Sequence, residues 1–191
     1  MLNITERALL QSLCELLEER TLDKVNVKDI TDKCGLTRNT FYYHFHDIYD
    51  ALNCYFEEEI KQLLSRYENN EDWNDGFLEG LRLVYDHKTM IEHIYKFVDS
   101  FELRNYLDSI IFKHALTVID KEFRKTSYDN RVKEIAADFY TNALLGATVK
   151  WIVDGMKQKP ENMAALYSSV FYGTINQTFD SIDKALKQFS E

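Results

Sequence analysis

The residues best suited to bind another molecule lie between Thr37 and Tyr43. Arg38 and Asn39 can each form paired hydrogen bonds with the edge of a DNA base, and hydroxyl groups and cations can hold phosphates. Tyr42 and Tyr43 share the outer face of the same short helix. Amides at the start of this helix can also donate to a phosphate, because the positive end of the helix dipole lies there. These residue types predict contact with a DNA groove.

A helix-turn-helix is expected to hold these residues. Asn26 and Asp29 form a capping-box pattern at the start of one short helix, and Gly35 follows that helix as the residue that best tolerates a left-handed turn. Thr37 is then expected to cap a second short helix, in which Phe41 points inward with the helical period. Two short helices joined by a tight glycine turn form this motif.

Most of the remaining sequence also predicts helix. A helix that begins after Asn3 precedes the motif, and a helix over residues 47–68 follows it. Beyond a polar stretch, apolar residues again recur at helical spacing. A long helix is expected over about residues 131–157, and Pro160 suits the first turn of the last one. With six glycines and one proline, the chain lacks the turn residues of an all-β fold.

The expected fold class is therefore all-α, in two parts. Residues 1–46 are predicted to form a three-helix helix-turn-helix domain. Residues 47–191 are predicted to form a C-terminal helical bundle, and their first helix, 47–68, connects the two parts.

The charge of the chain is acidic, at −9, but the helix-turn-helix is basic. Residues 24–46 contain four basic residues and two acidic ones, which gives this segment a net charge of +2. An acidic chain does not bind polyanions indiscriminately, so the basic segment favours a local DNA-binding surface. No apolar run approaches the ~18 residues of a membrane span, and no secretory signal is recognised, so a cytoplasmic location is expected.

Neither a metal site nor an enzyme active site is expected. Cys14, Cys34 and Cys54 are widely spaced and fit small core residues better than a disulfide framework or a zinc site. His44 and His46 are two apart and do not share a helix face. Other histidines, His93 and His114 among them, are interpreted as ordinary hydrogen-bonded residues, although a pocket or metal role is the alternative. The chain carries no common catalytic motif, so no cofactor is expected.

The segment from Ile30 to Phe45 resembles the DNA-binding signature of the TetR family of bacterial transcription regulators. The matching pattern is Ile30-Thr31-x-x-Cys34-Gly35-Leu36-Thr37-x-x-Thr40-Phe41-Tyr42-x-His44-Phe45. The similarity covers roughly residues 4–56, and residues 139–156 resemble the C-terminal domain of one subgroup more loosely. The resemblance implies a homodimer in which the last two long helices of each chain pair across a two-fold axis.

The resemblance also implies a function. It points to a sequence-specific regulator, a repressor by default, that binds a roughly palindromic operator in double-stranded DNA and responds to a small-molecule effector or a co-regulator protein. The C-terminal domain would serve dimerisation and effector sensing. The alternatives are a transcriptional activator of the same fold, a helical protein-interaction module without DNA binding and a helical enzyme, the last disfavoured by the missing motifs.

The expected DNA contacts come from residue types on the outer face of the second helix and from positions in or beside the family signature. These residues are Lys28, Thr37, Arg38, Asn39, Thr40, Tyr42, Tyr43 and His44. Tyr42 and His44 stand where the family contacts phosphates, and Lys28 faces the DNA backbone. Ile48 stands where the family commonly has lysine, and Asn39 replaces a commonly small residue. Fewer cations predict a shallower salt dependence of binding.

Two further sets of residues are expected in the C-terminal domain. An interior effector pocket is expected among the aromatic residues and one histidine, namely Tyr85, Tyr95, Tyr106, His114 and Phe139. The dimer interface is expected along the last two helices, at Leu144, Ala147, Trp151, Phe171 and Ile175. The sequence indicates neither the identity of the effector nor the sequence of the operator.

Overall fold

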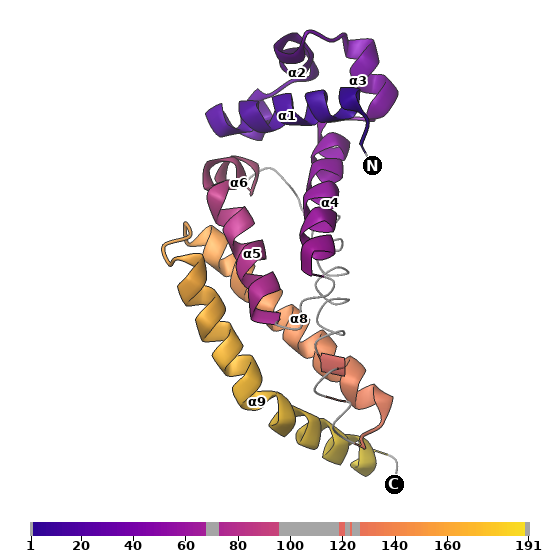
Figure 1. Ribbon diagram of the computed structural model, residues 1–191, viewed down its shortest axis with the longest axis vertical. Coiled ribbons are helices and arrows are strands. Elements are labelled where there is room, and N and C mark those ends of the chain that lie inside the picture. Colours follow the sequence, from indigo (N-terminus) through magenta and orange to yellow (C-terminus); the bar gives the residue numbers. More distant parts are fainter. Residues whose placement is uncertain (1, 68–72, 96–118, 121–122, 124–126, 190–191) are drawn as a thin grey trace. The chain divides into compact units, whose positions relative to one another are not determined.

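A computed structural model describes residues 2–67, 73–95, 119–120, 123 and 127–189, and every regular element in these ranges is a helix (Figure 1). The all-α fold predicted from the sequence is confirmed. None of the described helices combines the length and the hydrophobicity that crossing a membrane requires.

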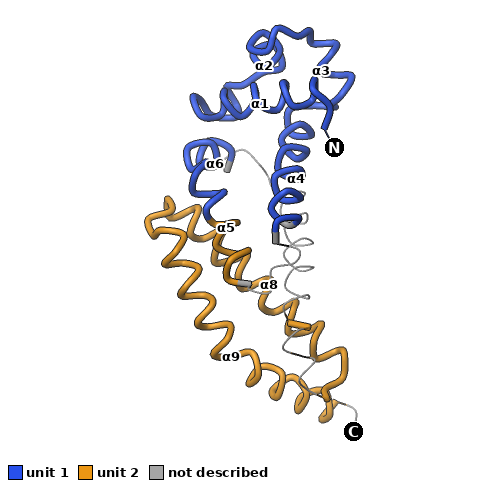
Figure 2. The backbone as a smooth tube through the Cα atoms, viewed as in Figure 1, with its two compact units in different colours: residues 1–70, 82–100 blue, residues 71–81, 101–191 orange. Residues whose placement is uncertain are grey.

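The chain divides into two compact units (Figure 2). The first holds residues 1–70 and 82–100, and the second holds residues 71–81 and 101–191. The boundary between them therefore falls inside helix α5, Trp73–Asp86. These units describe packing, and the functional boundary expected after residue 46 stays a prediction.

The first unit contains most of the shorter helices. Its complete elements are α1 (Ile4–Glu19), the 3₁₀ helix η1 (Leu22–Lys24), α2 (Val27–Cys34), α3 (Arg38–His44), α4 (Ile48–Tyr67) and α6 (Lys88–Tyr95). The start of α1 is capped as the sequence predicts. The amide of Glu6 donates to Asn3 Oδ1 at 2.9 Å, and the amide of Asn3 donates to Glu6 Oε2 at 2.8 Å. This exchange satisfies two amides that would otherwise lack partners.

Side chains from five α-helices and from the 3₁₀ helix η1 form the core of the first unit. One stripe of α1 is entirely inside, because Leu9, Leu13 and Leu17 recur at helical spacing and are at most 1% exposed. Phe41 of α3 and Met90 of α6 belong to the same hydrophobic cluster. The short helices α2 and α3 thus depend on tertiary packing for their stability, since isolated helices of this length are marginal in water.

The second unit is built around two long helices. These are α8 (Asn130–Val153) and α9 (Pro160–Gln188), which pack against each other through Tyr140, Phe171 and Ile175. Pro160 opens α9 as the sequence predicts. The prediction that the preceding helix extends to residue 157 is wrong. It ends at Val153 because Gly155 and Met156 turn the chain with φ values of +78° and +49°.

Candidate nucleic-acid interface

The turn between α2 and α3 sets the angle of the motif. Gly35 has φ +70° and ψ 26°, in the left-handed region where a residue without Cβ is not strained. The amide of Leu36 donates to the carbonyl of Thr31 at 2.9 Å, which closes the end of α2. Thr37 then returns to an extended conformation with φ −100°. The glycine turn predicted from the sequence is therefore confirmed.

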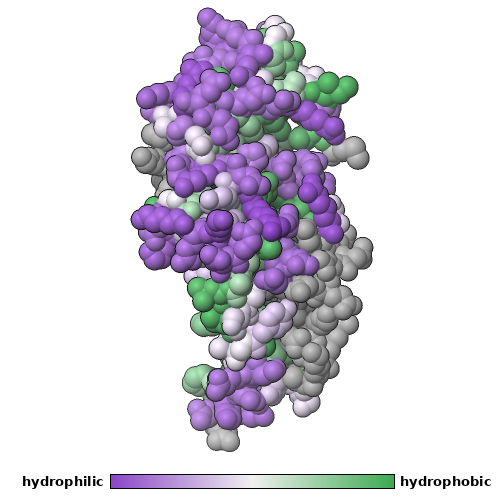
Figure 3. Space-filling view, turned by 60° about the vertical axis from the view of Figure 1, so that its left-hand side comes forward, coloured by the Kyte–Doolittle hydropathy of each residue, from purple (hydrophilic) through white to green (hydrophobic). Residues whose placement is uncertain are grey.

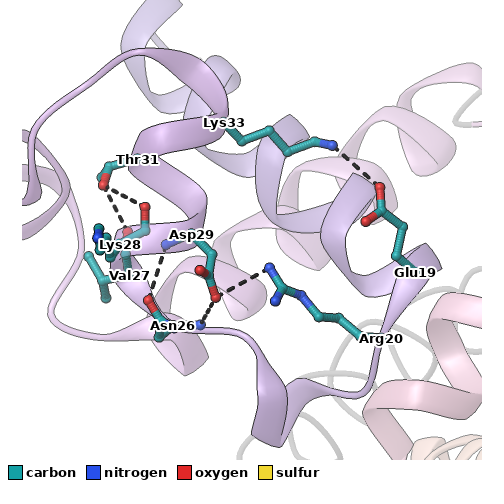
Figure 4. Close-up of polar contacts among 8 residues, drawn as sticks. All are labelled: Glu19, Arg20, Asn26, Val27, Lys28, Asp29, Thr31 and Lys33. Atoms are coloured by element: carbon teal, nitrogen blue, oxygen red, sulfur yellow. Dashed lines mark hydrogen bonds and ion pairs between the residues drawn. The ribbon is translucent and has the colours of Figure 1, made fainter.

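A polar network fixes α2 against the end of α1 (Figure 4). Asn26 and Asp29 cap α2 reciprocally at 3.1 and 3.2 Å, and Asp29 also pairs with Arg20 at 3.2 Å. Lys33 lies 3.2 Å from Glu15 and 3.6 Å from a second carboxylate of α1. The hydrogen bond from Lys33 to Glu15 raises the pKa of the lysine. Because these carboxylates offset its charge, Lys33 adds little to the positive charge that the helix-turn-helix offers to DNA.

Helix α3 has one buried side and one exposed side. Thr37 caps it, because its Oγ1 accepts from the amide of Thr40 at 3.2 Å. Phe41 is 0% exposed and anchors the helix in the core. On the other side Tyr42 is 58% and Tyr43 84% exposed, far more than a core aromatic residue would be. The remaining predicted contacts that are also exposed are Lys28, Thr37, Arg38 and Asn39, while Thr40 is half-buried.

His44 lies apart from this exposed surface. Its side chain is only 11% exposed, and its Nδ1 lies 3.2 Å from Oε1 of Glu6. Glu6 is also the return half of the α1 capping box, so His44 ties the last residue of α3 to the first turn of α1. The structure therefore gives His44 a positioning contact, and a phosphate contact by this residue stays a prediction.

The start of α4 explains the isoleucine at a position where the family commonly has lysine. Ile48 is half-buried and packs against the hydrophobic core of the first unit. Just before it, Asp47 accepts a hydrogen bond from the amide of Asp50 at 2.9 Å, and this bond lowers the pKa of the Asp47 carboxyl. The entry to α4 thus offers an apolar side chain and a carboxylate, neither of which holds a phosphate.

Only two of the residues predicted to line an effector pocket have described side chains, and they belong to different compact units. Tyr85 is half-buried in α5, and Phe139 is 60% exposed on α8. Tyr106 and His114 lie outside the described residues, as does the side chain of Tyr95. Phe139 instead borders an open groove of about 400 Å³ between α8 and α9, together with Ile135, Thr174, Gln177, Thr178, Ser181 and Ile182. The pocket stays a prediction.

The residues predicted for the dimer interface are mostly covered within a single chain. Leu144, Phe171 and Ile175 lie in the core between α8 and α9, and Trp151 is 5% exposed. Ala147 is half-buried. A second, exposed set of apolar residues on the two helices was missed by the sequence reasoning, and it comprises Ile135, Phe139, Val153, Leu166, Val170 and Tyr172. Hydrophobic residues also reach the visible surface in Figure 3.

The thiols show no sign of reactivity. Cys14, Cys34 and Cys54 are free and half-buried. Burial raises the pKa of Cys14 to about 12, so this thiol stays protonated near neutral pH. Within the described residues, histidines, cysteines and carboxylates nowhere gather in groups of three or more that would hold a metal ion.

Two family models match the chain. Residues 9–50 match the bacterial regulatory proteins of the tetR family, and residues 71–173 match a transcriptional regulator C-terminal region. Among curated proteins, the HTH-type dhaKLM operon transcriptional activator DhaS of Lactococcus lactis subsp. lactis (strain IL1403) is 24% identical over 115 residues. That alignment spans 57% of this chain and 62% of the relative, which is less than two thirds of the relative's length.

Solved structures share the fold over nearly the whole chain. The dihydroxyacetone kinase operon activator DhaS superposes with a TM-score of 0.74 at 19% identity, over 91% of this chain and 97% of that one. NalD, the secondary repressor of the MexAB-OprM multidrug efflux pump in Pseudomonas aeruginosa, gives a TM-score of 0.61 at 17% identity, over 88% and 94% of the two chains. At such identities the likeness establishes the fold.

Proposed function

Because the chain belongs to the TetR family of DNA-binding transcriptional regulators, we propose that it binds operator DNA as a homodimer and controls transcription from a nearby promoter. The observation that carries the proposal is the two-sided character of α3. Phe41 fixes the helix from within, while Arg38, Asn39, Tyr42 and Tyr43 are exposed together on its outer side. A helix presented in this way can enter a major groove.

Roles follow from side-chain chemistry. Arg38 and Asn39 occupy the first two positions of α3, where a recognition helix contacts base edges. Lys28 and Tyr42 are proposed to contact phosphates, with Thr37, Thr40 and Tyr43 in support. A phosphate contact by Lys28 or Tyr42 does not distinguish one base from another.

Selection of preferred DNA from a random pool tests the proposal. A two-fold symmetric dimer should recover a roughly palindromic sequence, with half-sites about 34–36 Å apart, or 10–10.5 base pairs centre to centre. Recovery of one asymmetric half-site would contradict the homodimer. Binding that is indifferent to sequence would instead favour a protein-interaction module.

We place the dimer contact on the outer α8–α9 face, defined by Ile135, Phe139, Gly146, Val170 and Gly173. Apart from the neighbouring residues and the backbone of the same helix, no heavy atom of the described residues lies within 4 Å of the positions that Cβ atoms would take at the two glycines. Glycine inside a helix costs roughly 0.5–1 kcal/mol relative to alanine. A second helix packing closely against this face would give both glycines a purpose that the single chain does not supply.

Phe139→Ala is expected to weaken this dimer. The ring is 60% exposed in the single chain, and truncation of a central aromatic residue at an interface costs about 1–2 kcal/mol, or roughly tenfold in dissociation constant. Analytical ultracentrifugation over a dilution series measures the change. Tyr172→Ala is the matched control, because this exposed ring lies two residues from Val170 and so on a different side of α9. Equal weakening by both variants would contradict the assignment of this face.

The sign of regulation is proposed as repression, by occupation of a promoter. The relatives include both an activator and a repressor, so the comparisons favour neither. A reporter placed behind the selected operator distinguishes them, because a repressor lowers its expression and an activator raises it. We further propose that the chain acts in the cytoplasm, by binding rather than catalysis. A small molecule or a co-regulator protein would control it through different affinities for its DNA-competent and DNA-incompetent states.

A further inference from the structure

Helix α6 is part of the first compact unit and packs against α1. Met90 and Ile94 are 1% and 3% exposed and belong to the same core cluster as Leu17. Between them, Nδ1 of His93 lies 2.7 Å from the carbonyl oxygen of Leu17. Because a carbonyl only accepts, the hydrogen bond requires a proton on Nδ1 of His93. This contact joins residues that are 76 positions apart in the sequence.

The carbonyl that His93 contacts lies at the C-terminal end of α1, where backbone carbonyls lack partners within the helix and negative charges gather. The last four carbonyls of an α-helix have no partner within the helix, and Leu17 is among them in α1. The last turn of α1 contains no basic residue, and Glu18 and Glu19 add negative charge where the helix dipole is already negative. His93 supplies the missing donor, and His87 lies 3.6 Å from Glu18 with its Nδ1. Helix α6 therefore stabilises the end of α1.

The same end of α1 holds α2. Glu15 pairs with Lys33. Figure 4 shows the pairs of Glu19 with Lys33 and of Arg20, the residue that follows α1, with Asp29. Residues 15–20, which we call the α1 end, are thus hydrogen-bonded to α6 through His93, contacted by His87 just before α6, and joined to α2 through a separate set of charges. Because α2 and α3 are joined by the Gly35 turn, the α1 end contributes to the position of the recognition helix, together with the core contacts of Phe41 and the contact of His44 with Glu6.

We propose that His93 is a positioning residue through which α6 sets the DNA-competent position of the helix-turn-helix. The inference rests on the proposed function and adds a route for its regulation. Only His87 separates α6 from α5, and α5 contains the boundary with the second unit. A change in the second unit that moves α5 therefore has a covalent path to α6, and from there a hydrogen-bonded path to α1.

Two substitutions at His93 separate positioning from simple packing. His93→Asn keeps an N–H donor close to the place of Nδ1, whereas His93→Leu fills similar space without a donor. In the free protein, hydrogen exchange of the α2 amides is expected to be faster in His93→Leu than in the wild type, and unchanged in His93→Asn. This comparison needs no DNA, so it remains decisive if the proposed function fails. Equal exchange in all three proteins would overturn the inference.

Binding to the selected operator tests whether bound DNA affects α6 through the helix-turn-helix and α1. Coupling is reciprocal, so DNA bound to wild-type protein should slow exchange in α6 as well as in α2 and α3. His93→Leu should lose the effect on α6 and bind the operator about 5- to 150-fold more weakly, while His93→Asn keeps both. Operator binding that leaves α6 exchange unchanged in the wild type would overturn the inference while sparing the proposed function. Failure of the wild type to select any operator would instead count against the function.

Discussion

Replacement of Phe41 by alanine is expected to lower the free energy of unfolding by about 3–5 kcal/mol. The ring is 0% exposed and has two aromatic neighbours, Tyr42 and Phe45, with ring centroids 5.6 Å away in each case. Its removal leaves a cavity where α3 meets the core of the first unit, and a helix of 7 residues has little stability of its own. We therefore expect DNA binding to be lost together with the folded helix-turn-helix.

Chemical denaturation followed by circular dichroism measures this change, with Tyr42→Ala as the matched control. Tyr42 is the next residue, but it is 58% exposed, so its removal should change the free energy of unfolding by no more than about 0.5 kcal/mol. The control should nevertheless weaken DNA binding to all sequences by similar factors. If the two substitutions destabilise the protein equally, α3 does not have the buried and exposed sides described above.

Local signals explain why the helix-turn-helix could be predicted from the sequence. The caps at Asn3 and Asn26 need only a partner three residues later, and the turn at Gly35 needs only a residue that accepts positive φ. The inward position of Phe41 follows from helical period alone. Each of these features depends on neighbours within a few residues, so each can be predicted from the sequence alone.

Contacts between distant segments could not be predicted in the same way. The contact of His44 with Glu6 and the hydrogen bond of His93 to Leu17 join helices whose relative placement no periodicity specifies. The dimer prediction shows the same limit. Phe171 belongs to one apolar stripe of α9, which α8 already covers, while a second stripe remains exposed. A helix with apolar residues on more than one side does not reveal which side packs within the chain.

Substitution of Arg38 is expected to change which DNA sequence is preferred, and substitution of Lys28 is expected to weaken binding to all sequences. Arg38 is the first residue of α3 and is exposed. A good bidentate contact with a base contributes about 1–3 kcal/mol of discrimination, so Arg38→Ala should relax one position of each half-site by about 5- to 150-fold. Competition binding with single-base operator variants measures this loss.

Lys28 and Lys33 provide the contrast that separates charge from specificity. Both are exposed lysines of α2, but Lys33 pairs with two carboxylates of α1, whereas Lys28, near the start of the helix, forms no ion pair among the described residues. Each phosphate that a cation neutralises adds about 0.9 to the slope of log affinity against log salt. Lys28→Ala should therefore lower that slope by about 0.9 per chain and leave base preference intact, while Lys33→Ala should leave the slope unchanged. A lower slope for Lys33→Ala, or an altered base preference for Lys28→Ala, would mean that the recognition surface is not the one centred on Arg38.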